Sequence, residues 1–371
     1  MLTRFKVSGY RCFSNELDLN LANTRSYGFN TGAVRSGVVK DALIYGKNAV
    51  GKSNLGRALF DASDTMLGSA APSTGADPSY LNADSRTETA HFSYTLDIDD
   101  VEVVYSYAKT DRYTMAGELL SIDGEVVYEY DYPTSRWVEN RLSKYGAGDL
   151  NYEFMDSSLP VLKYACNNVP LRNLGPIGRA YEFLVHMRRT TDPETDFKRI
   201  LGHAATRIIT ADAVGDLQKF LGYFGIDDPL AVHRDPSGVP TLYFEKSRRI
   251  PFIENCSSGT GALVRLFRAL YLEGDTSILY VDEFDAFYHY ALAESVVAYL
   301  RDHVDMQVVA ATHNTDLFSN KVLRPDCLFI LSRDGVVSAA DATRRELREG
   351  HNLEKLYKAG EFDNAPSAIH N

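Results

Sequence analysis

The residues of this chain that are best suited to chemistry form one short run of glycine, lysine and serine. The run Gly46-Lys47-Asn48-Ala49-Val50-Gly51-Lys52-Ser53 has the complete spacing G-x-x-x-x-G-K-[ST]. In such a loop, glycines let backbone N–H groups turn toward phosphate oxygens, the lysine places its charge on the β- and γ-phosphates, and the serine hydroxyl is a ligand for Mg²⁺. The run therefore predicts a phosphate-binding loop with a Mg²⁺ site.

A pair of acidic residues, Asp282-Glu283, forms a second candidate group. It directly follows the apolar run Ser277–Val281, which is typical of a strand in the centre of a parallel sheet. Acidic side chains at the carboxyl end of such a strand lie where an open α/β sheet binds its ligand. We expect Asp282 to hold Mg²⁺ through water and Glu283 to polarise an attacking water molecule. A solvated strand end is the alternative, and the phosphate loop makes the functional interpretation preferable.

Two further polar segments accompany the acidic pair. The run Asn255–Gly261 contains small residues and opens a predicted helix, so its backbone N–H groups form a second anion site. It would serve the phosphates of the first loop only from another subunit, and a plain helix N-cap is the alternative. His313 follows the next predicted strand, where a catalytic role is preferred over a structural one.

The elements around these residues must bring them together. Asp41–Tyr45 is predicted as a buried strand and Ser53–Phe60 as a helix, so that phosphates lie at a helix N-terminus. More than two hundred residues separate Lys52 from Asp282, and this gap requires inserted material. The pattern predicts an N-terminal hairpin over Leu2–Leu21, an antiparallel β meander over Thr87–Tyr132 and a helical segment over Ile177–Phe224.

Other segments receive simpler assignments. The meander strands are predicted at His91–Leu96, Val101–Tyr107, Glu118–Ile122 and Val126–Tyr130. Residues 68–84 are expected to form an exposed loop, residues 133–156 are expected to be irregular, and Asp212 is expected to cap a helix over Ala213–Phe224. Later strands are predicted at Thr241–Glu245, Ile278–Val281, Gln307–Ala311 and Cys327–Ser332, and later helices at Ala262–Tyr271 and Tyr290–Asp302.

Composition limits the class of protein. The chain has 371 residues and a formal net charge of -11, so contact with nucleic acid would need a local basic patch. Its four cysteines are scattered, which argues against a zinc module and a disulfide framework. Apolar runs are too short to span a bilayer and the N-terminus lacks a signal peptide pattern, so we expect a cytoplasmic protein without membrane partners.

Together these motifs resemble the ABC-type ATPases of the SMC/RecF/OLD class, and in particular the AAA-15/AAA-21-type proteins of bacteria. The match covers nearly the whole chain. Its most specific parts are Gly46–Ser53 as Walker A, Cys256–Thr260 as the signature motif, with Ser in place of the usual first glycine, and Ile278–Glu283 as Walker B. Weaker matches are the N-terminal strand Phe5–Phe13, the D-loop segment Glu283–His289, the switch histidine His313, and the tail segments His351–Tyr357 and Gly360–Phe362.

The resemblance implies an α/β fold: an ATPase head, in which a mixed sheet with the phosphate loop joins an antiparallel β subdomain, with a short helical insertion. It implies an N-terminal lobe over residues 1–165, the insertion over 166–235 and a C-terminal lobe over 236–371. The resemblance implies ATP and Mg²⁺ as cofactors, with Lys52, Glu283 and His313 as catalytic residues and Ser53 and Asp282 as metal ligands. The residues implied to bind ATP are Gly46, Asn48, Gly51, Lys52, Ser53, Asn54, Ser257 and Gly259.

The resemblance further implies a homodimer or higher oligomer with two ATP molecules between the chains, in which Ser257 and Gly259 of one chain cap the γ-phosphate held by the other.

One departure from the family pattern concerns its Mg²⁺-sensing glutamine. The chain contains only Gln218 and Gln307, neither at the expected place, and His91 is the candidate substitute. We therefore expect slow ATP hydrolysis.

Related compact ATPases resemble components of bacterial anti-phage and abortive-infection modules. We expect a sensor or scaffold ATPase that controls a separate effector nuclease or toxin, since the chain leaves no room for a fused nuclease. A RecF-like clamp on DNA and an interaction protein with little hydrolysis are the alternatives. Seven basic residues of the helical insertion either contact nucleic acid or form a solvated face: Arg172, Arg179, Arg188, Arg189, Lys198, Arg199 and Arg207.

Overall fold

The structure is a computed structural model that describes residues 1–68, 79–153, 155–190 and 197–362. Its central element is a six-stranded sheet with the strand order β11-β15-β16-β5-β17-β18. The strands are β11 Arg188–Arg189, β15 Ile278–Val281, β16 Gln307–Thr312, β5 Asp41–Tyr45, β17 Leu328–Leu331 and β18 Val336–Ser338. The first five are parallel and β18 is antiparallel, so most carboxyl ends meet at one edge.

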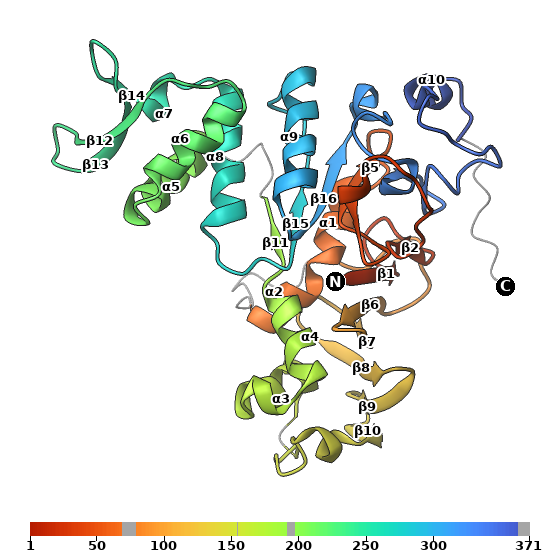
Figure 1. Cartoon of the computed structure of the whole chain (residues 1–371). Helices are drawn as coiled ribbons and strands as arrows, with labels where there is room; N and C mark the ends of the chain where they lie inside the picture. Colours follow the sequence, from red (N-terminus) through yellow and green to blue (C-terminus); the bar gives the residue numbers. More distant parts are fainter. Residues whose placement is uncertain (69–78, 154, 191–196, 363–371) are drawn as a thin grey trace.

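A seven-stranded antiparallel sheet, with the order β10-β9-β8-β7-β6-β1-β2, lies below the first sheet in the view of Figure 1. Its strands are β1 Leu2–Ser8, β2 Leu17–Asn20, β6 Ala90–Ile98, β7 Val101–Lys109, β8 Met115–Ile122, β9 Glu125–Asp131 and β10 Arg136–Asn140. Buried and partly exposed residues alternate along β6 and β7, because one face packs on the core and the other faces solvent. The predicted hairpin and meander are confirmed.

Helices cover the parallel sheet and build the insertion. They are α1 Lys52–Leu59, α2 Asp61–Leu67, α3 Val161–Asn168, α4 Pro176–Val185, α5 Phe197–Thr210, α6 Val214–Tyr223, α7 Phe252–Asn255, α8 Ser258–Tyr271, α9 Tyr290–His303 and α10 Leu353–Lys358. Helices α5 and α6 pack on α8, beside a small sheet of β12 Leu230–Arg234, β13 Pro240–Phe244 and β14 Ile250–Pro251 (Figure 1). This arrangement confirms the predicted fold class, including the short helical insertion.

Minor elements complete the chain. Two short strands, β3 Val34–Arg35 and β4 Val38–Val39, pair with each other. The 3₁₀ helices are η1 Thr31–Ala33, η2 Leu142–Tyr145, η3 Leu171–Asn173, η4 Thr315–Leu317 and η5 Pro325–Cys327.

One buried glutamine joins the two large sheets. The Gln307 side chain is 1% exposed, and its Nε2 donates hydrogen bonds to the carbonyls of Leu2 at 2.9 Å and Val39 at 2.8 Å. Its Oε1 accepts the Leu2 N–H at 3.0 Å. Every polar atom of the amide is therefore paired, which is what a buried amide requires. Gln307 is a structural link between β16 and β1.

Four local expectations were wrong. Residues 133–156 contain β10 and η2, because Trp137 packs its ring against Tyr130 and Tyr152. In the predicted exposed loop, residues 69–78 lie outside the described residues, but Tyr80 and Asn82 are buried.

The other two corrections concern the helical segment. Asp212 does not cap α6: it has a left-handed φ of 54°, and the N-cap is Ala213, which has no side-chain acceptor. The segment is also interrupted by β11, which pairs with β15 through the register Arg188 to Leu279. The division into residues 1–165, 166–235 and 236–371 stays a prediction.

Candidate nucleotide site

The predicted phosphate loop connects β5 to α1, and its glycines are required by close contacts. A Cβ on Gly46 would lie 2.7 Å from Val50 Cγ2 and 2.9 Å from the Leu331 carbonyl oxygen. A Cβ on Gly51 would lie 2.6 Å from Cys12 Sγ, and Gly51 has a φ of 109°. Ala49 is also left-handed, with a φ of 64°. The loop therefore has the tight backbone that turns N–H groups toward an anion.

Lys52 is the first residue of α1 and its ammonium group lies over the start of the loop. Lys52 Nζ donates hydrogen bonds to the carbonyls of Gly46 at 2.8 Å and Lys47 at 3.4 Å. Burial lowers the pKa of Lys52, while the charges of Asp282, Glu283 and Asp285 act in the opposite direction. The lysine therefore shares one electrostatic environment with the acidic segment.

Helix α1 packs closely on β15, the strand that carries the acidic pair. The Tyr280 hydroxyl donates a hydrogen bond to the Lys52 carbonyl at 2.7 Å. A Cβ on Gly56 would lie 2.4 Å from Tyr280 Cε1, so glycine alone permits this approach. Sequence reasoning missed both residues, although a glycine one helical turn after the loop lysine is a signal for close packing.

The segment after β15 is held in a fixed turn. Glu283 is exposed and has a φ of 45°, which is unusual for a residue with a side chain. Phe284 is buried, and its N–H donates to the Ala311 carbonyl at 2.9 Å. Thr312 Oγ1 donates to Asp285 Oδ1 at 2.5 Å. These bonds attach the acidic segment to the end of β16, the neighbouring strand.

His313 follows the last residue of β16, and its side chain is exposed. Strand β16 lies between β15 and β5, and all three are parallel. Because parallel strands end at the same edge, the structure brings the phosphate loop, the acidic pair and His313 to that edge. Their individual roles stay predictions.

The signature segment forms the open N-terminus of α8. Ser257 Oγ accepts the N–H of Thr260 at 3.0 Å, so Ser257 is the N-cap, and the helix begins four residues before the predicted Ala262. A Cβ on Gly259 would lie 3.3 Å from the Phe287 carbonyl oxygen. The helix N-terminus therefore lies beside the segment that follows Glu283, and both Ser257 and Ser258 are exposed.

The other predicted ligands differ in their availability. Ser53 is partly exposed and Asn48 is exposed at the loop tip. Asn54 is engaged within the protein, since its Nδ2 donates to Cys12 Sγ at 3.2 Å and its Oδ1 accepts from Arg57 at 3.1 Å. The loop between β1 and β2 therefore covers one side of the phosphate loop.

His91, the candidate substitute for the Mg²⁺-sensing glutamine, does not lie at the edge that carries the phosphate loop. His91 is exposed on β6, opposite Ala108 of β7, on the solvent face of the antiparallel sheet. Alternation along β6 separates it from Tyr94 on the core face, whose hydroxyl bonds to the Ala58 carbonyl of α1. The structure instead places β11 next to β15, so the residue that reaches the nucleotide edge there is Thr190, whose N–H donates to the Tyr280 carbonyl at 2.9 Å.

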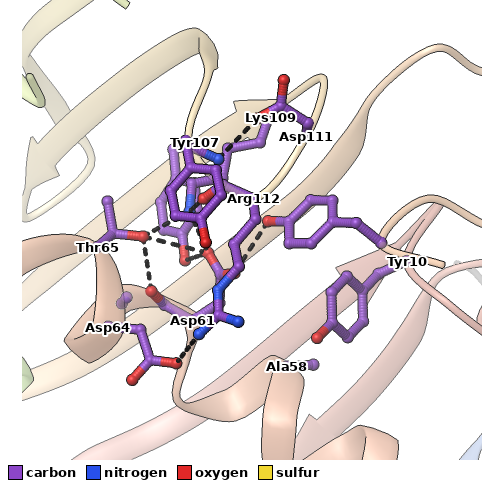
Figure 2. Close-up of polar contacts among 12 residues, drawn as sticks. Tyr10, Ala58, Asp61, Asp64, Thr65, Tyr107, Lys109, Asp111 and Arg112 are labelled. Atoms are coloured by element: carbon purple, nitrogen blue, oxygen red, sulfur yellow. Dashed lines mark hydrogen bonds and ion pairs between the residues drawn. The ribbon is translucent and has the colours of Figure 1, made fainter. Parts of the chain in front are cut away.

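A buried polar cluster fixes α2, the helix that follows α1, on the antiparallel sheet (Figure 2). The Asp61 carboxylate accepts hydrogen bonds from the Tyr107 hydroxyl at 2.9 Å and from Lys109 Nζ at 2.8 Å. Lys109 also donates to Thr65 Oγ1 at 2.5 Å. The Tyr80 hydroxyl completes the set with a 2.9 Å bond to Asp61. The helices behind the phosphate loop therefore have a rigid support.

The basic residues of the insertion do not form one helical stripe. Arg188 and Arg189 lie on β11, and Arg189 pairs with Asp64 of α2 at 3.8 Å. Arg179 pairs with Asp99, and Arg207 donates to the Leu272 carbonyl at 3.2 Å. The solvated or locally paired interpretation therefore describes these residues better than a continuous nucleic-acid surface.

Comparison with known protein families identifies one that matches most of this chain. A model for the family described as "AAA domain, putative AbiEii toxin, Type IV TA system" matches residues 42–319. No significant match was found among curated proteins. In the described part of the chain, no helix is both long and apolar enough to cross a membrane.

Several solved structures align with nearly the whole chain. The SMC head bound to the C-winged helix domain of ScpA has 14% identity and a TM-score of 0.46, covering 96% of this chain and 99% of that chain. The SMC head domain from Thermotoga maritima has 14% identity and a TM-score of 0.46, covering 91% and 98%. The Smc head from Pyrococcus furiosus, with an extended coiled coil and bound to the C-terminal domain of ScpA, has 13% identity and a TM-score of 0.40, covering 96% and 98%.

Proposed function

The chain belongs to the family described as "AAA domain, putative AbiEii toxin, Type IV TA system", and we propose that it is an ATP-hydrolysing switch that controls a separate effector protein. The observation that carries this proposal is the single edge at which the phosphate loop, Asp282-Glu283 and His313 meet. Positioning and charge are the main requirements of phosphoryl transfer, and this edge supplies both.

The roles follow from the chemistry of each group. Backbone N–H groups of the loop and the Lys52 ammonium bind the phosphates of ATP. The Ser53 hydroxyl and Asp282 would hold Mg²⁺, an oxygen-seeking ion, and the tight glycine loop fits such a phosphate–metal site. When bound, the ion neutralises charge that develops on the phosphates. Glu283 orients the attacking water and His313 contacts the terminal phosphate.

The signature segment acts on a second copy of the chain. Its N–H groups form an open helix N-terminus, which favours anions, and it lies beside the segment that follows Glu283. Two chains around two ATP molecules would therefore complete each other's sites. ATP binding closes the pair and hydrolysis opens it, which is a population shift driven by the ligand.

The family description contains both an AAA domain and a toxin system, and this supports a role in bacterial anti-phage defence. In this proposal, the closed ATP-bound dimer holds an effector nuclease or toxin. The dimer releases this effector when ATP hydrolysis opens it. The locally paired basic residues support a protein partner over a direct DNA clamp.

Complementation between two inactive variants tests the shared site. Ser257→Asp retains an N-cap but places a negative charge at the phosphate site, whereas Ser257→Asn is a neutral cap and the matched control. We expect Lys52→Ala and Ser257→Asp to be inactive alone and to recover part of the ATPase activity when mixed, because one hybrid site is then intact. Activity of Lys52→Ala alone, or no recovery on mixing, would contradict the shared site.

The effector is tested with tagged Glu283→Gln protein purified with Mg-ATP from the native host, with Lys52→Ala as control. A stoichiometric second protein with Glu283→Gln alone supports the switch. Nucleic acid without a protein partner would instead indicate a DNA-acting clamp.

A further inference from the structure

The turn between β17 and β18 lies beside the phosphate loop and carries an arginine, Arg333, that has no role in the site described above. Strand β17 runs parallel to β5, with Ile330 opposite Tyr45. The contact continues one residue further, since a Cβ on Gly46 would lie 2.9 Å from the Leu331 carbonyl oxygen. Neighbouring strands are about 4.8 Å apart, so the chain after Leu331 leaves the sheet next to the chain after Gly46.

This turn is short and closed by hydrogen bonds. The Ser332 N–H donates to the Gly335 carbonyl at 2.9 Å, and the Asp334 N–H donates to Ser332 Oγ at 3.2 Å. Gly335 has a φ of 148°, which favours glycine. Arg333 therefore stands in a turn of fixed backbone. It is exposed, and the described residues provide neither an ion pair nor a hydrogen bond to its guanidinium.

The position of Lys52 indicates which end of a nucleotide faces this turn. In a loop of this type the lysine binds the β- and γ-phosphates. Here its ammonium group lies over the carbonyls of Gly46 and Lys47. Gly46 also lies against Leu331, the last residue of β17 before the turn. The terminal phosphate of a bound nucleotide therefore lies toward Arg333.

The charge at this edge favours a second cation. Three carboxylates, Asp282, Glu283 and Asp285, are close enough to act on Lys52. A nucleoside triphosphate adds further negative charge between them and the loop. Like charges at short range repel strongly where water is partly excluded. A guanidinium on the opposite side of the loop offsets this repulsion, and its planar fork matches phosphate oxygens.

We propose that Arg333 contacts the terminal phosphate of a nucleoside triphosphate bound to the phosphate loop of the same chain. The proposal rests on the function proposed above and deepens it, because a cation at the terminal phosphate separates the triphosphate from the diphosphate. Arg333 is then a specificity residue of the switch: it stabilises the ATP-bound state and has little contact with ADP.

The test is calorimetric titration of the full chain with ATPγS and with ADP, each in the presence of Mg²⁺. We expect Arg333→Ala to weaken ATPγS binding about tenfold and ADP binding less than twofold, and Arg333→Lys to recover part of the loss. Arg136→Ala is the matched control, because it removes the same charge from exposed β10, far from β5 in Figure 1. Thermal melting of each variant verifies that the fold is retained.

Three results would overturn the proposal. Unchanged binding of both nucleotides by Arg333→Ala excludes a contact. An equal loss for ATPγS and ADP, or the same loss in Arg136→Ala, assigns the effect to general charge. If the unmodified protein binds neither nucleotide, the function itself fails, and this outcome is distinguishable because it does not depend on Arg333.

Discussion

Carboxylates in two regions of this protein differ in their burial and in their hydrogen bonds. In the antiparallel sheet, Glu118 is fully buried and its oxygens accept five hydrogen bonds. The donors are the hydroxyls of Tyr105, Tyr128 and Tyr132 and the backbone N–H groups of Val161 and Leu162. At the nucleotide edge, Glu283 is exposed and Asp282 is partly exposed.

The difference separates structure from function. Burial raises the pKa of Glu118, and the hydrogen bonds from Tyr132 and the N-terminus of α3 oppose that shift. Such a network is complete without a ligand, so it stabilises the fold and leaves nothing to bind. The nucleotide edge retains open acceptors and donors, which a phosphate and a metal ion can use. Variants at the two regions should therefore separate stability from activity.

The largest effect is expected at Glu118. Glu118→Ala removes an acceptor from five buried donors. The Tyr132 hydroxyl and the Val161 N–H each retain one other acceptor, and the remaining three donors lose theirs, which costs free energy. We expect a loss of about 4 kcal/mol in the free energy of unfolding, measured by urea denaturation. Glu118→Gln retains acceptor capacity and should lose less. A stability equal to that of the unmodified protein would contradict the structural role.

The second effect is on turnover. Glu283→Gln should lower the ATPase rate about 100-fold, because the water loses its orienting base, and leave the melting temperature unchanged. The rate is measured by phosphate release under saturating ATP. A large loss of stability with normal turnover would reverse the comparison and remove Glu283 from catalysis.

A third prediction concerns pH and a carboxyl group that fits neither region. Asp41 is buried at the start of β5, 3.0 Å from Lys40 Nζ, and its oxygens lack well-aligned hydrogen bonds. Burial raises its pKa to about 7, against the attraction of Lys40 and Arg301 and with a further rise from Asp302.

The raised pKa fixes the sign of the effect. The folded protein retains the Asp41 proton up to about pH 7, whereas the unfolded chain releases it near pH 4. Its stabilising contribution is therefore complete below about pH 4 and is lost as the pH rises to about 7. Between pH 5 and 7 we expect a loss of about 2 kcal/mol, measured by urea denaturation. Asp41→Asn should lack this component, and identical pH profiles for the two proteins would contradict it.

The smallest effect tests the contact between α1 and β15. Tyr280→Phe removes the hydrogen bond to the Lys52 carbonyl but keeps the ring against Gly56. We expect a loss of about 1 kcal/mol in stability and a small decrease in nucleotide affinity, both measured on the same preparation. A decrease as large as that of Lys52→Ala would show that the hydroxyl positions the lysine.

The sequence predicted the strands and the helix that flank the phosphate loop well because their patterns are local. The phosphate loop lies between a strand and a helix, and the bounds of β5 and β15 agree with their predicted residues. The meander was also predicted, since its strands alternate and an Asp-Asp turn and an Asp-Gly turn separate two of the strand pairs.

The wrong predictions concern segments whose structure depends on residues that are distant in the sequence. Strand β11 has two residues and forms because β15 offers a free edge, which no local pattern reveals. Trp137 is partly buried against Tyr152, and Tyr80 is buried with its hydroxyl bonded to Asp61, so both depend on residues outside their own segments. His91 was suggested from its position in the sequence, but the strand alternation directs its side chain to solvent. The role of Gln307 depends on Leu2, a residue 305 positions away.

The link between Gln307 and Leu2 has a consequence for synthesis. Strand β1 is synthesised well before its neighbour β6, which begins at Ala90, and before Gln307, which lies 305 residues after Leu2. Contacts between residues this distant in sequence slow folding. A strand edge that is still unpaired promotes aggregation until its partner strand has been synthesised. The partners of strand β1 are therefore completed only after a long stretch of further synthesis, and its edges are exposed to other chains during that interval.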